Sequence, residues 1–279
     1  MPLTWVARNL TGLPIEVAGL TPTALADKSL AEIERLPVQQ GNRQVPVAEF
    51  FDISGAASER VWQFEGDLSR VHWLAAGLDA GRIHVDGSVG RHAGSGMSGG
   101  TLTISGDAGD WLGAEMSGGH IDVAGSAGNL VAAPYRGARR GMTGGTILIR
   151  GDAGDELGRA MRRGLIAVAG NVGTAAGYDL LAGTILIGGS VGPRLGAGTR
   201  RGTIVLTRKG ALSRAAPLEL PPTFRRAARY QPTFLRLLAR HLAQFGFPFS
   251  LDDAAAEYET YVGDLLTVGK GEVLVRVDR

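Results

Sequence analysis

The sequence predicts an all-β protein built as a parallel β-helix, a solenoid of about seven to eight coils of 19 residues with small α+β regions at both ends. Two observations carry this prediction. Glycine recurs at 19-residue intervals, with one longer gap of 26, at Gly81, Gly100, Gly119, Gly145, Gly164, Gly183 and Gly202. Two apolar residues at a spacing of two follow each glycine: Ile83/Val85, Leu102/Ile104, Ile121/Val123, Ile147/Ile149, Ile166/Val168, Ile185/Ile187 and Ile204/Leu206.

A period of 19 residues is too short for two helices but suits one solenoid turn of short strands and tight corners. Because side chains alternate along a strand, each apolar pair should point inward and the residue between should face solvent. A second apolar column, predicted to fill another inner corner, consists of Met97, Met116, Met142, Met161 and Leu180. The segment GSGMSGG, Gly94 to Gly100, matches G-x-G-x-x-G, but a strand-like TLTI follows it where a dinucleotide site needs a helix.

The repeat divides the chain into three regions. Residues 1–65 form a predicted N-terminal α+β capping region, with strands in LTWVAR and IEVAG and a helix from Asp27 to Leu36. Residues 66–207 are the glycine-repeat β-helix. Residues 208–279 form a C-terminal extension that either caps the solenoid or docks a partner, with a terminal strand in EVLVRV. Its predicted helix carries an apolar stripe of Phe234, Leu237, Leu238, Leu242 and Phe245.

Composition excludes several function classes. The formal net charge of +2 in 279 residues argues against strong nonspecific binding of nucleic acid. The absence of cysteine excludes disulfides, thiolate zinc sites, iron–sulfur ligation and a cysteine nucleophile in this chain. No signal peptide opens the sequence and no apolar stretch reaches about 18 residues, so we expect a cytoplasmic protein with no membrane partner.

The sequence offers neither catalytic residues nor metal ligands. Its five histidines, His72, His84, His92, His120 and His241, show no metal-ligand spacing. The motif GDAGD occurs at 106–110 and 151–155, which raises the question of paired carboxylates or calcium ligands. Serine or asparagine fills the same repeat position at Ser88, Ser126 and Asn171, which a required calcium ligand would not permit. The aspartates are therefore interpreted as turn residues.

An arginine pattern is the strongest binding signal. The fourth coil holds seven extra residues within AAPYRGARRGMTGG, and later Arg162/Arg163 and Arg200/Arg201 occupy one repeat position two coils apart. Guanidinium groups suit carboxylates and phosphates, and an insertion in a regular repeat is a usual place for binding. The alternative is a solvated basic ridge or a contact between subunits. The predicted binding residues are Tyr135, Arg136, Arg139, Arg140, Arg162 and Arg163.

The repeat segments GGTLTISGDAGDWLGAEMSGG and GMTGGTILIRGDAGDELGRAM resemble the glycine-repeat domain shared by glutamate synthase C-terminal regions and the C subunits of formylmethanofuran dehydrogenases. The flanks IEVAGLTPTALADKSLAEIERLPVQQGN and FEGDLSRVHWLAAGLDAGRIHVDGSVG resemble these C subunits. The tail YETYVGDLLTVGKGEVLVRV is similar to the form found in the bacterial formyltransferase/hydrolase complex of methylotrophs. This resemblance implies that the coils are right-handed.

The resemblance also implies a function: a non-catalytic scaffold subunit of a complex in one-carbon metabolism. That complex would process formyl groups on methanofuran or methylofuran and on tetrahydromethanopterin to formate. The implied partners are formyltransferase subunits and an amidohydrolase-like metalloenzyme subunit. The chain would bind no cofactor covalently, but it would hold the polyglutamyl tail of the furan coenzyme at an interface.

Two other classes stay open on the residues alone. One is a glutamate-synthase-like glycine-repeat domain that couples active sites, which copurifying partners would distinguish. The other is an independent β-helix acyltransferase or lyase. Acyltransferases of the hexapeptide type repeat in sixes and eighteens, and lyases commonly carry acidic metal sites, and the sequence shows neither feature.

Overall fold

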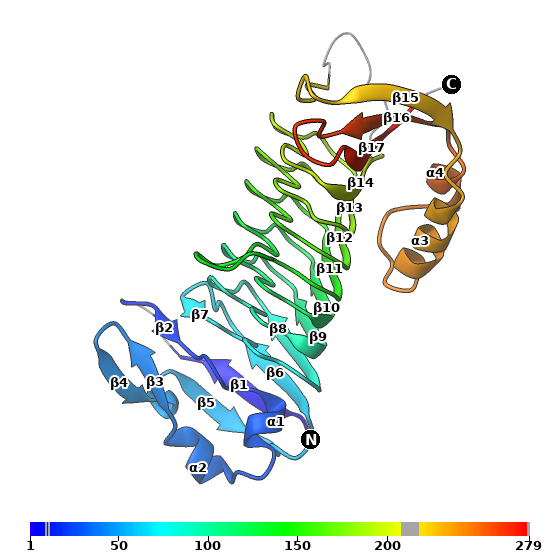
Figure 1. The fold of residues 1–279 in the computed structure, drawn as a ribbon. Helices are drawn as coiled ribbons and strands as arrows, with labels where there is room; N and C mark the ends of the chain where they lie inside the picture. The colour runs from blue at the N-terminus through cyan, green and yellow to red at the C-terminus, as the bar shows by residue number, and fades with distance from the viewer. Residues whose placement is uncertain (9, 11, 208–217, 278–279) are drawn as a thin grey trace.

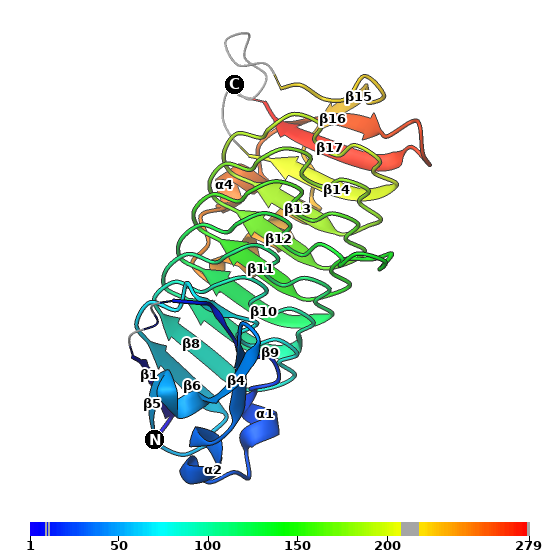
Figure 2. The ribbon, with the colours of Figure 1, turned by 90° about the vertical axis from the view of Figure 1, so that its left-hand side faces the viewer.

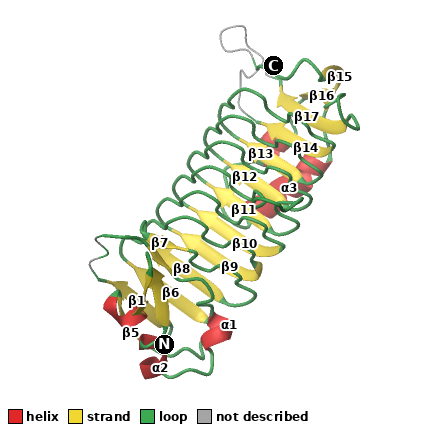
Figure 3. Cartoon of the chain, turned by 60° about the vertical axis from the view of Figure 1, so that its left-hand side comes forward, coloured by secondary structure: helices red, strands yellow, loops and turns green. Residues whose placement is uncertain are grey.

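The computed structural model describes residues 1–8, 10, 12–207 and 218–277 (Figure 1). Each repeat contributes one strand, and these strands lie side by side along the molecule (Figures 1 and 3). The seven repeat strands are β8 (Arg82–Asp86), β9 (Ser98–Ile104), β10 (Gly118–Val123), β11 (Thr146–Ile149), β12 (Leu165–Val168), β13 (Thr184–Ile187) and β14 (Arg201–Leu206).

Short strands and helices precede the repeats. The strands are β1 (Leu3–Ala7), β2 (Ile15–Glu16), β3 (Pro37–Gln40), β4 (Arg43–Pro46), β5 (Phe51–Ser54), β6 (Val61–Glu65) and β7 (Val71–His72). The helices are α1 (Pro22–Leu25), α2 (Leu30–Glu34) and the 3-10 turn η1 (Val47–Glu49). Helix α2 is shorter than predicted because Ser29 begins it with a capping box, in which Ser29 and Glu32 satisfy each other's backbone amides.

The C-terminal region adds three strands and two helices. They are β15 (Arg225–Tyr230), α3 (Phe234–Ala243), α4 (Leu251–Ala254), β16 (Tyr258–Gly263) and β17 (Lys270–Arg276). Strand β17 pairs parallel to β14, so the end of the chain continues the sheet of the repeats. The predicted boundary between 66–207 and 208–279 adjoins residues 208–217, which lie outside the described residues. The three-region division therefore stays a prediction.

The predicted fold class, a right-handed parallel β-helix, is wrong. The structure contains one mixed sheet of 13 strands, in the order β15-β16-β17-β14-β13-β12-β11-β10-β9-β8-β6-β1-β5, and a four-stranded sheet, β4-β3-β2-β7. Pairing is antiparallel for β15 with β16, for β16 with β17 and for β1 with β5. The rest of each repeat is turns that stack on one another (Figure 2). Single β-bridges, such as Val89 to Ala108, join these turns.

The reason lies in backbone conformations that the sequence pattern does not reveal. Between β9 and β10, Trp111, Gly113 and Glu115 all have φ between 55° and 60°. Other repeats place positive φ at the equivalent positions, Trp73, Ala75 and Gly77 among them. Left-handed residues at every second position cannot form an extended strand. Each repeat therefore provides one strand where several were expected.

The predicted packing of the apolar residues is confirmed. The first members of the seven pairs lie in parallel register, for example Ile83 opposite Leu102 and Ile147 opposite Ile166. The 26-residue spacing keeps this register, because Ile121 pairs with Ile147. All residues of the pairs, and the whole methionine column with Leu180, are at most 2% exposed. Burial of this stripe is the main favourable term in folding the repeats.

The GDAGD aspartates form hydrogen-bond ladders between repeats, which confirms their role as turn residues. Asp107 accepts a hydrogen bond from the backbone N–H of Ser126 at 2.7 Å. The same repeat position supplies the acceptor in later repeats. Asp152 accepts from the backbone amide of Asn171 at 2.6 Å, and Asn171 Oδ1 accepts from the amide of Ser190 at 2.9 Å. Within the described ranges no group of three or more His, Cys, Asp or Glu is arranged to hold a metal ion.

The outer face of the sheet differs between the two halves of the repeat region. The residue between each apolar pair was predicted to face solvent, and His84 does so. In β11 to β14 this prediction is wrong, since the equivalent residues are all at most 1% exposed: Leu148, Ala167, Leu186 and Val205. They form a second core with buried residues of α3 and of the segment after it, including Leu235, Leu242 and Phe247.

The predicted apolar stripe of α3 is also only partly right. Leu235, Ala239 and Leu242 are buried, whereas Leu237 is 68% exposed. None of the helices in the part of the chain that is described has the length and apolar character needed to cross a bilayer.

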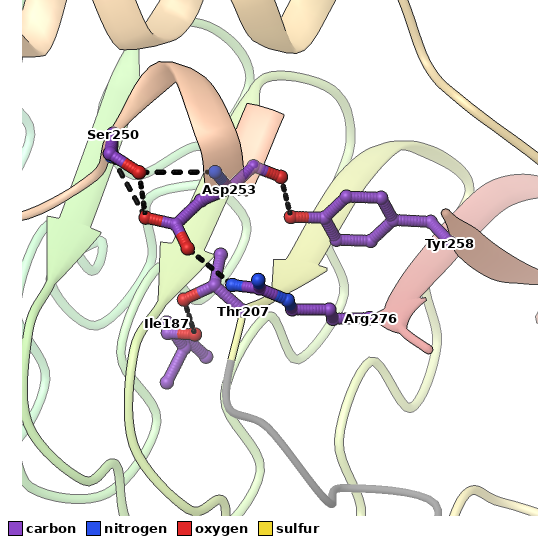
Figure 4. A network of polar contacts seen from close by, with 6 residues as sticks. All are labelled: Ile187, Thr207, Ser250, Asp253, Tyr258 and Arg276. Carbon is purple, nitrogen blue, oxygen red and sulfur yellow. Dashed lines mark hydrogen bonds and ion pairs between the residues drawn. The ribbon is translucent and has the colours of Figure 1, made fainter. Parts of the chain in front are cut away.

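Polar contacts fix the helices of the C-terminal region onto the sheet. Asp253 on α4 accepts hydrogen bonds from Ser250 and from Arg276 of β17, and its carbonyl accepts one from the Tyr258 hydroxyl at 3.0 Å (Figure 4). Burial would raise the pKa of Asp253, but the hydrogen bonds from Ser250 and Arg276 outweigh it and hold the pKa below its ordinary value. The ionised carboxylate thus joins α4 to the last strand.

The C-terminal end of α3 is held over β10. The His120 ring stacks on Phe245, with the ring centroids 4.2 Å apart. Arg150, paired with Asp122 at 2.8 Å, donates to the Phe245 carbonyl, also at 2.8 Å. His120 Nδ1 is buried and has no hydrogen-bond partner in the structure. Burial lowers the pKa of His120, so the ring is neutral when the helix is docked.

The ladder predicts the effects of two substitutions at Asp107. Asp107→Ala removes the acceptor for the Ser126 amide, so the free energy of unfolding should fall by about 0.5–1.5 kcal/mol. Asp107→Asn keeps the Oδ1 acceptor that Asn171 uses at the same repeat position, and should retain most of that stability. Denaturant titration measures both variants. Equal losses would show that the negative charge, and not the hydrogen bond, matters at this position.

His120 should make stability depend on pH. Its folded pKa lies below the unfolded value of about 6.5, so the unfolded state takes up a proton more readily. The free energy of unfolding should therefore fall as the pH drops below about 6.5 and through the folded pKa. His120→Phe, which keeps an aromatic ring on Phe245 but cannot titrate, should flatten this decline. The exposed His84→Gln is the control, and an identical pH profile for His120→Phe and wild type would refute the role of His120.

Candidate functional site

A groove lined mainly by arginines lies at one corner of the later repeats. Its volume is about 970 Å³. Seven arginines line it: Arg139, Arg140, Arg159, Arg162, Arg163, Arg200 and Arg201. The other lining residues are Pro134, Ala138, Ala160, Gly164, Asp179, Leu181, Ala182, Gly183 and Val268. We call this feature the arginine groove.

The repeat stacking positions these arginines. The backbone amide of Arg162 donates to the Met142 carbonyl at 2.8 Å, and that of Arg200 donates to Leu180 at 2.8 Å. Met161, which precedes Arg162, is fully buried in the apolar core. Each arginine pair therefore follows an anchored inner residue, and its side chains are exposed at the corner.

In the earlier repeats glycine occupies the same corner, where the backbone lies close to the preceding repeat. Arg163, Ala182 and Arg201 occupy the repeat position of Gly99 and Gly118. A Cβ atom on Gly99 would lie 2.0 Å from the carbonyl oxygen of Asp79 in the preceding repeat. A side chain at Gly99 would therefore clash with the backbone of the preceding repeat.

The charge in the arginine groove is poorly balanced. Asp179 is the one carboxylate among the lining residues. Arg159 forms an ion pair with Glu156 at 2.7 Å and lies over the Tyr178 ring at 5.4 Å. The other six arginines form no ion pair with any described residue. The groove therefore suits an anion that carries several carboxylates or phosphates.

The structure brings together four of the six predicted binding residues: Arg139, Arg140, Arg162 and Arg163 all line the arginine groove. Arg136 is exposed but is not among the lining residues. The predicted set lacked Arg200 and Arg201, which share the repeat position of Arg162 and Arg163, and Arg159, which stands three residues before Arg162 in the same corner. It also lacked Val268, which arrives from the loop between β16 and β17. The repeat could have supplied the three arginines but not Val268.

Tyr135 lies in an aromatic cluster and not in the groove. Trp73, His92 and Trp111 occupy one position of three successive repeats and stack, with centroid distances of 4.2 Å and 5.4 Å. The Tyr135 ring packs beside them, and its hydroxyl lies 2.8 Å from His92 Nδ1 and 2.8 Å from Ser95 Oγ. Tyr135 thereby anchors the start of the insertion that supplies Arg139 and Arg140.

The aromatic cluster is a packed, uncharged structure that supports the insertion. Burial lowers the pKa of His92 and raises the pKa of Tyr135, so both groups are neutral. The backbone amide of Tyr135 donates to Glu115 Oε1 at 2.9 Å, which fixes the chain on the preceding repeat. No histidine lines the arginine groove. The groove thus offers charge and shape for binding an anion.

The curated proteins that the chain resembles are all C subunits of formylmethanofuran dehydrogenases. No family model matches the chain. It is similar to the C subunit of molybdenum-containing formylmethanofuran dehydrogenase 1 from Methanosarcina barkeri, 38% identical over 91 residues that cover 31% of this chain and 30% of the relative. It is also similar to the C subunit of tungsten-containing formylmethanofuran dehydrogenase 2 from Methanothermobacter marburgensis, 35% identical over 87 residues that cover 30% and 32%. The matched segments thus span about a third of these curated relatives.

A solved structure is similar over nearly the whole chain. It is a chain of the formyltransferase/hydrolase complex from Methylorubrum extorquens in complex with methylofuran. The two chains are 34% identical with a TM-score of 0.89, and the match covers 99% of this chain and 100% of the other. Because this likeness extends over the full length of that solved chain, and the curated relatives are all C subunits, the chain belongs to the C-subunit family of formylmethanofuran dehydrogenases.

Proposed function

We propose that the chain is a non-catalytic scaffold subunit of a formyltransferase/hydrolase complex, and that its arginine groove holds the polyglutamyl tail of a furan coenzyme. Its partners are then the formyltransferase subunits and an amidohydrolase-like metalloenzyme subunit of that complex. The family supports the assignment to such a complex, and the similar solved complex contains methylofuran. The observation that carries the binding proposal is the concentration of seven arginines around one carboxylate.

The shape of the groove favours a chain of carboxylates over a single anion. Arg162/Arg163 and Arg200/Arg201 are two repeats apart, which places them about 10 Å from one another along the sheet. Arg139 and Arg140 approach from the insertion. One exposed ion pair contributes only about 0.2–1 kcal/mol, so retention requires several pairs at once. A tail with repeated carboxylates meets this requirement, because all its charges are linked.

The lining residues support a binding role without catalysis. Apart from the arginines and Asp179, they are alanine, glycine, proline, leucine and valine, which supply neither a nucleophile nor a general base. The aspartates of the repeats are occupied by backbone amides, as Asp107 is by Ser126. The formyl chemistry therefore belongs to the partner subunits.

The assembly is tested by native mass spectrometry of the complex purified from its host through a tag on this chain. We expect companion subunits and a retained furan coenzyme in one particle. A particle that contains only this chain would contradict the scaffold function.

Coenzyme retention by the groove is tested with Arg140→Ala/Arg163→Ala in the purified complex. Loss of two exposed ion pairs should weaken retention about 2- to 30-fold, and raised salt should weaken the wild type in the same direction. Mass spectrometry of the denatured complex measures coenzyme content, and native mass spectrometry checks assembly. The matched control is Arg43→Ala/Arg236→Ala, which removes two exposed arginines outside the groove. Equal coenzyme content in both variants across a salt series would refute the binding role.

A further inference from the structure

Strand β15 forms one edge of the 13-stranded sheet. It pairs with β16 on one side and is the last strand in the sheet order. All six of its side chains, Arg225 to Tyr230, are exposed, so neither face of the strand is covered. Among the described residues no backbone hydrogen bond joins its outer edge to another element. Such an edge is a ready template for an added strand.

An exposed apolar loop lies beside the start of this strand. Residues 264–269 join β16 to β17, and Leu265, Leu266 and Val268 are 53%, 82% and 51% exposed. The Leu265 amide donates to the Thr223 carbonyl at 3.2 Å, which places the loop next to β15. Exposed apolar residues gathered in this way mark contact sites more often than isolated ones do.

The loop is held in one conformation. Asp264, only 5% exposed, accepts hydrogen bonds from the amides of Gly198 at 3.1 Å and Leu266 at 2.9 Å. The Thr267 hydroxyl donates to the Thr199 carbonyl at 2.7 Å. These hydrogen bonds hold Leu265 and Leu266 in a fixed, exposed position. Binding of a partner therefore costs little conformational entropy in this loop.

Strand β15 carries a positive charge that its neighbours balance only in part. Arg226 and Arg229 share one carboxylate, Glu259, at 2.6 Å and 3.5 Å. Arg225 donates to the carbonyl of Pro222. Three cations therefore meet one carboxylate along this edge, which favours a partner with acidic side chains.

A second copy of the chain fits this edge poorly. The antiparallel register that overlaps all six residues of two β15 strands would place Arg226 of one copy opposite Arg229 of the other. Like charges directly opposite each other on a sheet destabilise the pairing. The charge pattern thus selects a different, acidic chain.

We propose that the β15 edge and the 265–268 loop form a docking surface for an extended acidic segment of another subunit of the complex. The segment adds a strand to β15, its carboxylates pair with Arg225 and Arg229, and its apolar residues cover Leu265, Leu266 and Val268. The identity of the partner as a subunit rests on the proposed function. Val268 also lines the arginine groove, so the docked segment borders the end of that groove.

Amide hydrogen exchange of the isolated chain and of the purified complex tests the added strand directly. Outward amides of residues 225–230 should exchange at least about tenfold more slowly in the complex, because a partner strand accepts their hydrogen bonds. Unchanged exchange of β15 in an intact complex would overturn this inference and leave the proposed function standing. Failure of the wild-type chain to assemble with any other subunit would overturn both.

A pair of matched variants tests the chemistry of the surface. Arg225→Glu/Leu266→Asp should weaken assembly of the complex by tenfold or more, and the control Arg236→Glu/Leu237→Asp, on the exposed face of α3, should change it less than twofold. Titration of the labelled chain into the other subunits measures the affinity, and the melting temperature of each free variant checks its fold. Equal affinity of the two variants would overturn the proposed contact.

Discussion

The structure depends on one constraint, the stacking of each residue on its counterpart in the next repeat. Parallel backbone pairing places Ile147 opposite Ile166, and Ile166 opposite Ile185, so a residue type that recurs in the sequence becomes a continuous row in space. Isoleucines then make a core, and aspartates such as Asp152 make a ladder onto the amides of the next repeat. The arginine groove arises in the same way, because arginine pairs in different repeats line one corner.

Close stacking also decides where side chains are allowed. Gly99 approaches the preceding repeat so closely that a Cβ atom would lie 2.0 Å from a carbonyl oxygen. The later repeats replace this glycine with Arg163 and Arg201, and there the corner carries a charged groove. The glycine column thus permits close stacking in the first half of the repeats, and the arginine groove lies where arginine replaces this glycine. Tyr135 links the two halves, since it packs on the aromatic stack of the early repeats and begins the insertion that reaches the groove.

The sequence predicted the inner core well and the overall architecture poorly. Apolar residues at a spacing of two after a recurring glycine identify strands and their register, and burial of Met116 and its column follows from the same period. The fold class was wrong because left-handed residues such as Trp111 and Glu115 break the other sides of each repeat into turns, and local sequence does not reveal a positive φ at a non-glycine residue.

The errors outside the core have a common cause in long-range contacts. Leu148 and Leu186 stand at positions that face solvent in a lone sheet, but α3, which comes much later in the chain, covers them. The apolar character of these residues could have predicted that another element covers this face of the sheet, and it identifies the repeats that α3 covers. Similarly, Arg139, Arg140, Arg162 and Arg163 could be grouped from their spacing, whereas Val268 reaches the groove only through the loop after β16.

The positions of the two surfaces have a consequence for the complex. The arginine groove and the exposed loop share Val268, so a partner that covers the loop also changes the environment at the end of the groove. Excluding water there strengthens each guanidinium–carboxylate contact, because screening is weaker in a less polar setting. Under the proposed function, assembly and coenzyme retention should therefore favour each other by thermodynamic linkage. Stacked repeats can couple the two events without changing conformation, since Val268 already belongs to both surfaces.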